Sequence, residues 1–74
     1  MKIIVFGATG GVGRHVVKQA LEKGFEVTAF VRNPSKLEVE HDKLHIIQGD
    51  AFNKEEVSAA IDGHDAVISC LGSS

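Results

Sequence analysis

Four glycines fall within seven residues near the start of the chain, and this cluster restricts the fold more than any other feature of the sequence. The segment is Gly7-Ala8-Thr9-Gly10-Gly11-Val12-Gly13, and it follows directly on the apolar run from Ile3 to Phe6. Short uninterrupted apolar runs are typical of strands buried on both faces, as in parallel sheets. Apolar residues then recur at helical spacing until Gly24, a residue type that commonly ends helices. The pattern predicts a strand, a glycine loop and a helix over roughly residues 11–22.

Further strands alternate with helical segments in the rest of the chain. Asn33-Pro34 ends an apolar, β-branched run, because proline lacks the donor that a continuing strand needs. The polar stretch 35–43 has room for one helical turn. Asn53, with Glu56 three residues later, resembles a capping box and predicts a short helix that Asp62-Gly63 closes. The predicted strands after the first lie at 25–31, 44–47 and 66–71.

This alternation predicts an α/β fold with one parallel sheet and right-handed crossovers. We expect a Rossmann-type strand order of 3-2-1-4 with helices on both faces, and a ligand at the carboxyl ends of the strands beside the switch point. The sheet is expected to be truncated after its fourth strand, so that residues 1–74 form the N-terminal fragment of a longer domain. The open apolar edge of that strand predicts self-association by strand pairing.

Composition narrows the possible partners and compartment. The 74 residues are 43% hydrophobic and 24% charged, enough for one unit with a small core. The net charge of −2 without a basic block argues against nucleic acid. The first apolar run is far too short for a signal sequence or a membrane span, and a single cysteine, Cys70, fits a reducing compartment. We therefore expect a cytoplasmic protein with no membrane partner.

The glycine loop has the spacing and context of a dinucleotide fingerprint. Gly7 permits a tight turn, Gly10 removes a side chain where a pyrophosphate approaches the backbone, and Gly13 lets the helix pack on the strand. Unpaired amides of the first helical turn then face the phosphates. The loop lacks the Gly-Lys-Ser/Thr ending of a P-loop, which disfavours a nucleotide triphosphatase. The alternative is that the glycines only make a strand-to-helix turn. Thr9 can donate its hydroxyl to a phosphate or cap the helix, and the two roles are compatible.

The end of the second strand indicates which cofactor binds. NAD-preferring domains place an acidic residue there to hold the ribose hydroxyls. This chain has Arg32 instead, with Lys36 and Arg14 as further cations, and a guanidinium attracts a 2′-phosphate. The sequence therefore favours NADP over NAD. The alternative is that Arg32 is a surface arginine without a ligand.

Two further turns are candidates for the rest of the cofactor. Asp50 and Ala51, after the third strand, lie where an adenine ring would rest, and the Asp50 carboxylate can accept from its amine. A plain turn before the helix is the alternative. Leu71 and Gly72, after the fourth strand, are expected beside the nicotinamide, although the glycine also suits a simple strand end. The four histidines lack the ligand pattern of a metal site.

Taken together, these segments resemble the atypical short-chain dehydrogenase/reductase group, in particular flavin reductases of the biliverdin reductase B kind and NmrA-like proteins. The resemblance spans this chain but only the first part of such proteins, which are usually nearly three times as long. It implies the following cofactor-binding residues: Gly7, Thr9, Gly10, Gly11, Val12 and Gly13 at the pyrophosphate, Arg32 and Lys36 at the 2′-phosphate, Asp50 and Ala51 at adenine, and Leu71 and Gly72 near the nicotinamide.

The resemblance implies the NAD(P)H-binding portion of an oxidoreductase that transfers hydride between NADPH and a small carbonyl, quinone or flavin. Many short-chain dehydrogenases use a Tyr-x-x-x-Lys pair, whereas this chain contains no tyrosine. No catalytic residue is therefore assigned here, and the chain is not expected to be active alone. Two alternatives remain: a non-catalytic NAD(P)-sensing module of the NmrA-like kind, and an isolated folded fragment without activity.

Overall fold

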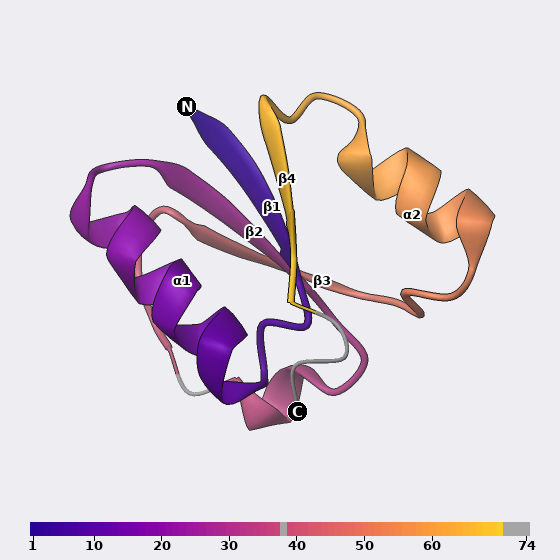
Figure 1. Ribbon diagram of the computed structural model, residues 1–74, viewed down its shortest axis with the longest axis horizontal. Helices are drawn as coiled ribbons and strands as arrows, with labels where there is room; N and C mark the ends of the chain where they lie inside the picture. The colour runs from indigo at the N-terminus through magenta and orange to yellow at the C-terminus, as the bar shows by residue number, and fades with distance from the viewer. Residues whose placement is uncertain (38, 71–74) are drawn as a thin grey trace.

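Four parallel strands form one twisted sheet, which is the centre of the molecule (Figure 1). The computed structural model describes residues 1–37 and 39–70. The strands are β1 (Lys2–Phe6), β2 (Glu26–Val31), β3 (Leu44–Gln48) and β4 (Ala66–Ser69), in the order β3-β2-β1-β4. The predicted fold class and strand order are confirmed. Within the described residues β4 ends at Ser69, and the predicted strand end at residue 71 lies outside them.

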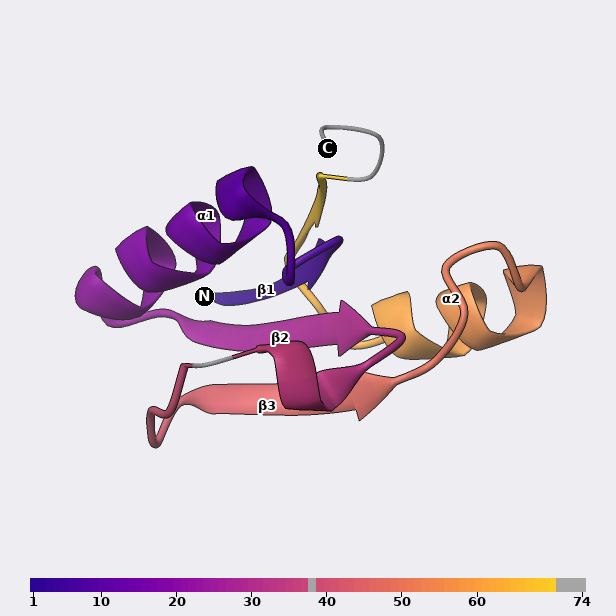
Figure 2. The same cartoon turned by 90° about the horizontal axis from the view of Figure 1, so that it is seen from below.

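The two helices lie on opposite faces of the sheet, as predicted (Figure 2). The first is α1 (Gly11–Glu22), which fills the predicted range, and the second is α2 (Lys54–Ile61). Successive strand residues point to alternate faces, so neighbouring apolar residues of β1 serve different helices. Ile3 and Val5 belong to the core that Val17 of α1 joins, while Ile4 and Phe6 belong to the core that Ala60 of α2 joins. A continuous apolar run is therefore what this two-sided sheet requires.

The described residues of the connection between β2 and β3, 32–37 and 39–43, form no α-helix. A single 3-10 turn, η1 (Pro34–Lys36), takes its place, which agrees with the predicted helical turn but begins one residue earlier. Pro34 fits the start of such a turn because its ring fixes φ and its missing N–H has no partner to lose there. Leu37 then packs into the α1 side of the core. Ile46 of β3 remains 44% exposed on the sheet surface, since no helix covers this part of it.

The helix ends follow the sequence signals, with one correction. Gly24 adopts a φ of +84° and its N–H donates to Leu21 O at 3.0 Å, which closes α1 as predicted. Asn53 Oδ1 accepts from the N–H of Glu56 at 3.1 Å, as the capping box requires. The reciprocal bond is absent, because Asn53 N–H donates to Asp50 O and the Glu56 carboxylate accepts from Asp50 N–H instead. The predicted capping box is thus only half formed.

None of the helices in residues 1–37 and 39–70 is long and apolar enough to cross a membrane.

Replacing Gly13 by alanine should test the contact between α1 and β1. An added Cβ would overlap Gly7 O and lie 2.8 Å from Ala8 Cα, and both are backbone atoms that cannot rotate away. We expect the Gly13→Ala change to lower the free energy of unfolding by about 1–3 kcal/mol, measured by urea denaturation. Gly11→Ala is the matched control, because a Cβ there meets nothing within 4 Å and should cost no stability. Equal stability of the two variants would contradict this account.

The self-association expected of the last strand remains a prediction. β4 is an edge strand without a charged residue, and Val67 is 48% exposed on it. We expect a concentration-dependent dimer in sedimentation velocity, which Val67→Lys should weaken because edge lysines oppose strand pairing. Ile46→Lys on the other edge strand is the control. A monomer at millimolar concentration would refute this expectation.

Candidate functional site

The glycine loop lies at the carboxyl end of β1 and leads directly into α1 (Figure 1). Gly7 has a φ of +78°, a conformation that side chains disfavour, and its carbonyl accepts from Gly10 N–H at 3.2 Å. The helix begins immediately, with Arg14 N–H donating to Gly10 O at 2.9 Å. Gly7 and Gly13 thus have the structural roles predicted for them: the tight turn and the close approach of the helix.

The two middle glycines have no comparable structural reason. Gly10 has φ −74° and ψ 165°, values that any residue adopts, and an added Cβ would make only an ordinary contact at 3.5 Å. A Cβ on Gly11 would meet nothing within 4 Å. A strand-to-helix turn therefore needs Gly7 and Gly13 but does not need these two. Their missing side chains leave the backbone of the loop open to an approaching group.

The start of α1 also lacks the usual caps. Helix geometry leaves the first amides without partners inside the helix. Gly10 is the N-cap and provides no side-chain hydrogen bond, and the first turn has no acidic residue. The alternative in which Thr9 caps the helix is therefore wrong, because Thr9 precedes the N-cap residue. The exposed N–H groups and the helix dipole together favour an anion at this position.

A cavity opens beside the loop, where the ends of three strands meet. It has a volume of about 140 Å³ and unites segments that are distant in sequence. Whole ligand sites usually measure about 300–1,000 Å³, so this cavity can enclose only one part of a dinucleotide. The lining residues are Gly7 and Thr9 after β1, Phe30, Val31 and Arg32 at the end of β2, and Gly49, Asp50, Ala51 and Phe52 after β3.

The structure brings together five of the twelve residues predicted to hold the cofactor, and Gly7 is one of them. Thr9, Arg32, Asp50 and Ala51 all line this one cavity. Parallel strands carry their carboxyl ends to the same edge of the sheet, which explains why turns 20 residues apart in sequence meet there. Gly10, Gly11 and Gly13 belong to the same loop but are not among the residues that line the cavity.

Two further predicted residues do not line the cavity, and two more lie outside the described residues. Lys36 is exposed on η1, and Val12 is 54% exposed on the first turn of α1. Leu71 and Gly72 lie outside the described residues. Their predicted roles near the 2′-phosphate, the pyrophosphate and the nicotinamide stay predictions.

Arg32 and Asp50 face each other at the mouth of the cavity. Arg32 Nη2 lies 3.9 Å from Asp50 Oδ1, with 72% and 51% of the two side chains exposed. Exposed pairs of this kind contribute at most about 1 kcal/mol. The pair is therefore weak enough for an incoming anion to take Arg32 from Asp50 at little cost.

Asp50 also organises the turn after β3. Its Oδ1 accepts from Phe52 N–H at 2.9 Å, and its own N–H donates to Glu56 Oε2 at 2.9 Å. Asp50 therefore has the structural role in the turn before α2 that was the alternative to a ligand contact. It does not conflict with a ligand contact, since a carboxylate has several acceptor positions and the residue lines the cavity.

Four residues of the cavity wall were not among the predicted cofactor-binding residues, namely Phe30, Val31, Gly49 and Phe52. Phe30 is buried, and its ring packs on Phe6 with centroids 5.0 Å apart. Gly49 is required there, because an added Cβ would lie 2.5 Å from the Phe30 ring. Phe52 is 81% exposed and is a flat apolar surface beside Asp50. An aromatic residue in a turn, two residues after Asp50, was a sequence signal for this role.

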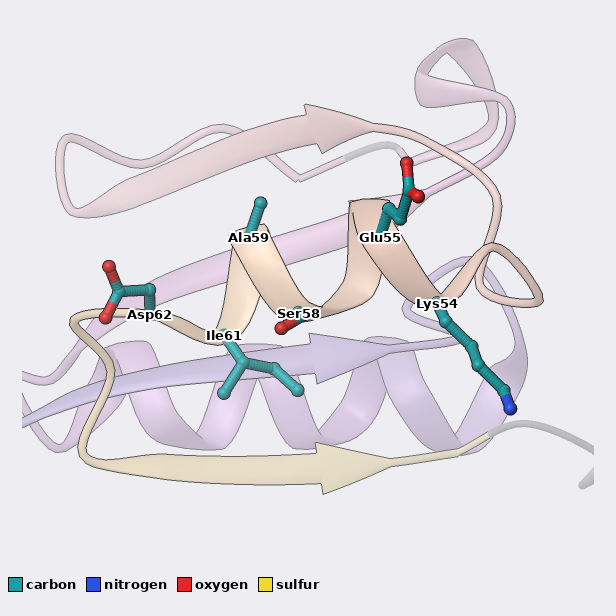
Figure 3. Close-up of a pocket in the computed structure, with 6 residues that line it drawn as sticks. All are labelled: Lys54, Glu55, Ser58, Ala59, Ile61 and Asp62. Carbon is teal, nitrogen blue, oxygen red and sulfur yellow. The ribbon is translucent and has the colours of Figure 1, made fainter.

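A broader and flatter hollow lies on the outer surface of α2 (Figure 3). It is lined by Lys54, Glu55, Ser58, Ala59, Ile61 and Asp62. The charged side chains of Lys54 and Glu55 point away from each other, whereas ligand sites have polar groups that converge (Figure 3). Among residues 1–37 and 39–70, no three His, Cys, Asp or Glu side chains are grouped to hold a metal. The cavity beside the glycine loop is therefore the candidate site.

Comparison with known proteins agrees with this assignment. The family described as NAD(P)H-binding matches residues 7–74 of the chain. The 3-beta-hydroxysteroid dehydrogenase of Mycolicibacterium neoaurum is 41% identical over 67 residues, which are 90% of this chain and 18% of that protein.

Solved structures show the same relationship. A Rossmann-fold NAD(P)-binding family protein from Shigella flexneri has 32% identity and a TM-score of 0.86, over 95% of this chain and 36% of that one. A Streptococcus pneumoniae protein described as a candidate NADH-flavin reductase has 38% identity and a TM-score of 0.73, over 97% of this chain and 31% of that one.

The chain thus spans about a fifth to a third of the length of these relatives. The family match nevertheless includes the glycine loop, the residues that line the cavity and the strands β2, β3 and β4. On this evidence the chain belongs to the NAD(P)H-binding family and has the Rossmann fold of its relatives.

Proposed function

We propose that this chain binds NADP and is the cofactor-binding part of an oxidoreductase. The reaction proposed is hydride transfer between NADPH and a small carbonyl, quinone or flavin substrate. The observation that supports this most strongly is the bare backbone at Gly10 and Gly11, which the fold does not require and a diphosphate does. The residues around this backbone supply the remaining contacts.

The pyrophosphate belongs at the start of α1. Backbone amides there have neither an intrahelical partner nor a side-chain cap, and the dipole of the helix adds a partial positive charge. Gly10 and Gly11 leave room for phosphate oxygens to reach these amides, and Thr9 offers a hydroxyl from the cavity wall. The loop therefore binds the diphosphate without a lysine.

The adenosine end belongs in the cavity. Phe52 offers a face on which adenine can stack, and Asp50 can accept a hydrogen bond from its amine. Arg32 lies at the end of β2, where a 2′-phosphate is expected, and a guanidinium recognises phosphate by paired N–H donors. An acidic residue, which would repel the phosphate, is absent from this strand end. These features favour NADP over NAD.

The bound dinucleotide supplies the hydride chemistry, and the residues of this chain bind and orient it. The names of the relatives support the oxidoreductase assignment, because they include a dehydrogenase and a candidate NADH-flavin reductase. The cofactor in the second name is NADH, so the argument for NADP depends on Arg32 and its neighbouring cations and not on the names of the relatives.

A non-catalytic NAD(P)-sensing module is the second candidate. The chain has no tyrosine, and the polar side chains lining the cavity suit binding better than proton transfer to a substrate. An assay of NADPH oxidation by the full-length native protein separates the two candidates. Oxidation with a quinone or flavin acceptor supports the enzyme, whereas tight binding without oxidation supports the sensor.

Titration of NADP and NAD into the chain, followed by backbone amide NMR, tests the binding proposal. We expect the largest shifts at residues 10–13 and at Arg32, with a stronger response to NADP, because only NADP carries the 2′-phosphate. ADP-ribose is a useful control, since it retains the diphosphate but lacks the nicotinamide. A saturating dinucleotide that shifts no amide of the glycine loop would refute the proposed site.

The Arg32→Asp change tests the choice between the two cofactors. It should weaken NADP binding by about 1.5–3 kcal/mol, the scale of a charged hydrogen bond, and should leave NAD binding nearly unchanged. Isothermal titration calorimetry measures both affinities. Lys18→Asp, an equal charge reversal at an exposed position of α1, is the control. An unchanged NADP affinity in Arg32→Asp would show that Arg32 does not hold the phosphate.

A further inference from the structure

Glu56 holds the turn that forms one wall of the cavity, although it does not line the cavity itself. It is the third residue of α2, and its Oε2 accepts a hydrogen bond from Asp50 N–H at 2.9 Å. Asp50 lines the cavity, whereas Glu56 lines a neighbouring groove together with Phe30 and Ile47. The contact therefore ties the cavity wall to the helix from outside the space that a ligand would fill.

The backbone before Asp50 needs such a link. The residue there is Gly49, because the Phe30 ring leaves no room for a Cβ. Glycine has the freest backbone, so bonds on both sides must fix the two peptide planes that flank it. Gly49 N–H donates to Val31 O at 3.0 Å, which fixes the plane before the glycine. Asp50 N–H lies in the plane after it, and Glu56 is the acceptor that fixes this plane.

The orientation of Asp50 determines which of its oxygens a ligand can use. Oδ1 accepts from Phe52 N–H at 2.9 Å and lies 3.9 Å from Arg32 Nη2. Oδ2 accepts no hydrogen bond from residues 1–37 and 39–70, and 51% of the side chain is exposed. Carboxylate oxygens have lone pairs for further donors. Oδ2 is consequently the acceptor left for a ligand, and its position depends on the backbone that Glu56 holds.

The base of the cofactor is the part that this acceptor can distinguish. Adenine carries an amine, which donates to a carboxylate, whereas hypoxanthine carries a carbonyl oxygen at the same position, which a carboxylate repels. A site that hydrogen-bonds one group rejects the analogue that lacks it, provided that the acceptor is held in place. Resting on the adenine position proposed above, we propose that Glu56 is a positioning residue, which orients the Asp50 carboxylate and so determines the preference for adenine.

Two dinucleotides that differ only in this group test the proposal, namely NADP and nicotinamide hypoxanthine dinucleotide phosphate. Calorimetry on the wild-type chain should show NADP bound about tenfold more tightly, the scale of one hydrogen bond to a charged group. In Glu56→Ala this ratio should fall below about threefold, because the Asp50 carboxylate is no longer fixed. A loss of stability alone would weaken the binding of both dinucleotides equally, so the ratio reports positioning.

Two conservative variants separate the hydrogen bond from the charge. Glu56→Gln keeps the length of the side chain and an acceptor oxygen, and it should retain the wild-type ratio. Glu56→Asp keeps the charge but is one methylene shorter, and it should lose the ratio as alanine does. Glu55→Ala is the matched control, because Glu55 is an exposed glutamate of the same helical turn. The thermal unfolding midpoint checks that each variant is folded, and the Gln and Asp variants decide the question if the alanine variant is not.

The outcomes are separable. A wild-type ratio in Glu56→Ala or in Glu56→Asp would overturn the proposal, and so would a ratio lost in Glu56→Gln, since the effect would then belong to the charge. A wild-type chain that binds both dinucleotides equally would refute the adenine position proposed above, and the inference with it. A wild-type chain that binds neither would refute the proposed function itself.

Discussion

The close contact between the start of α1 and the end of β1 is the constraint on which the rest of this structure depends. Gly13 approaches the backbone of Gly7 and Ala8 so closely that no side chain fits between them. This contact holds the N-terminus of α1 at the carboxyl edge of the sheet. The amides at the helix start consequently face the space in which the ends of β2 and β3 also finish. A helix held farther from the sheet would leave its amides facing solvent instead.

Polar groups that the fold does not satisfy are concentrated at this edge. The first turn of α1 is uncapped, the Arg14 Nε is unpaired, and Arg32 has only a weak partner in Asp50. Of these groups, the buried Arg14 Nε costs stability, because it has lost its bonds to water and has no partner among the described residues. Their common location is consistent with selection for an anionic ligand, since binding compensates for such costs. The opposite, amino edge has a hydrogen-bonded pair, Thr28 with His64.

The two faces of the sheet contribute differently to stability. The α1 side buries three helical residues besides Gly13, namely Val17, Ala20 and Leu21, whereas α2 buries only Ala60. Loss of apolar burial is the main cost of removing a packed element, so α1 is the more firmly attached helix. This places the glycine loop on the stable side of the molecule. The turn with Asp50 and Phe52 precedes the less buried helix, and it is the part of the cavity wall with more freedom to adjust to a ligand.

The sequence by itself determined the elements, their order and the position of the loop. Three signals were local: the apolar run before Gly7, the periodicity up to Gly24 and the turn at Asn33-Pro34. The structure has a strand, a helix and a turn at these positions. It also indicated Thr9, Arg32, Asp50 and Ala51 as neighbours, because parallel strands end at one edge.

Only the tertiary structure decided which groups contact each other. The pairing of Arg32 with Asp50, the diversion of the Glu56 carboxylate to Asp50 N–H and the position of Phe30 under Gly49 each join residues from different segments. The distinction among the glycines is of the same kind, because the sequence shows four alike, whereas surrounding atoms show which two the fold requires. Periodicity reports the conformation of one segment, but distances between segments depend on how the twisted sheet packs them together.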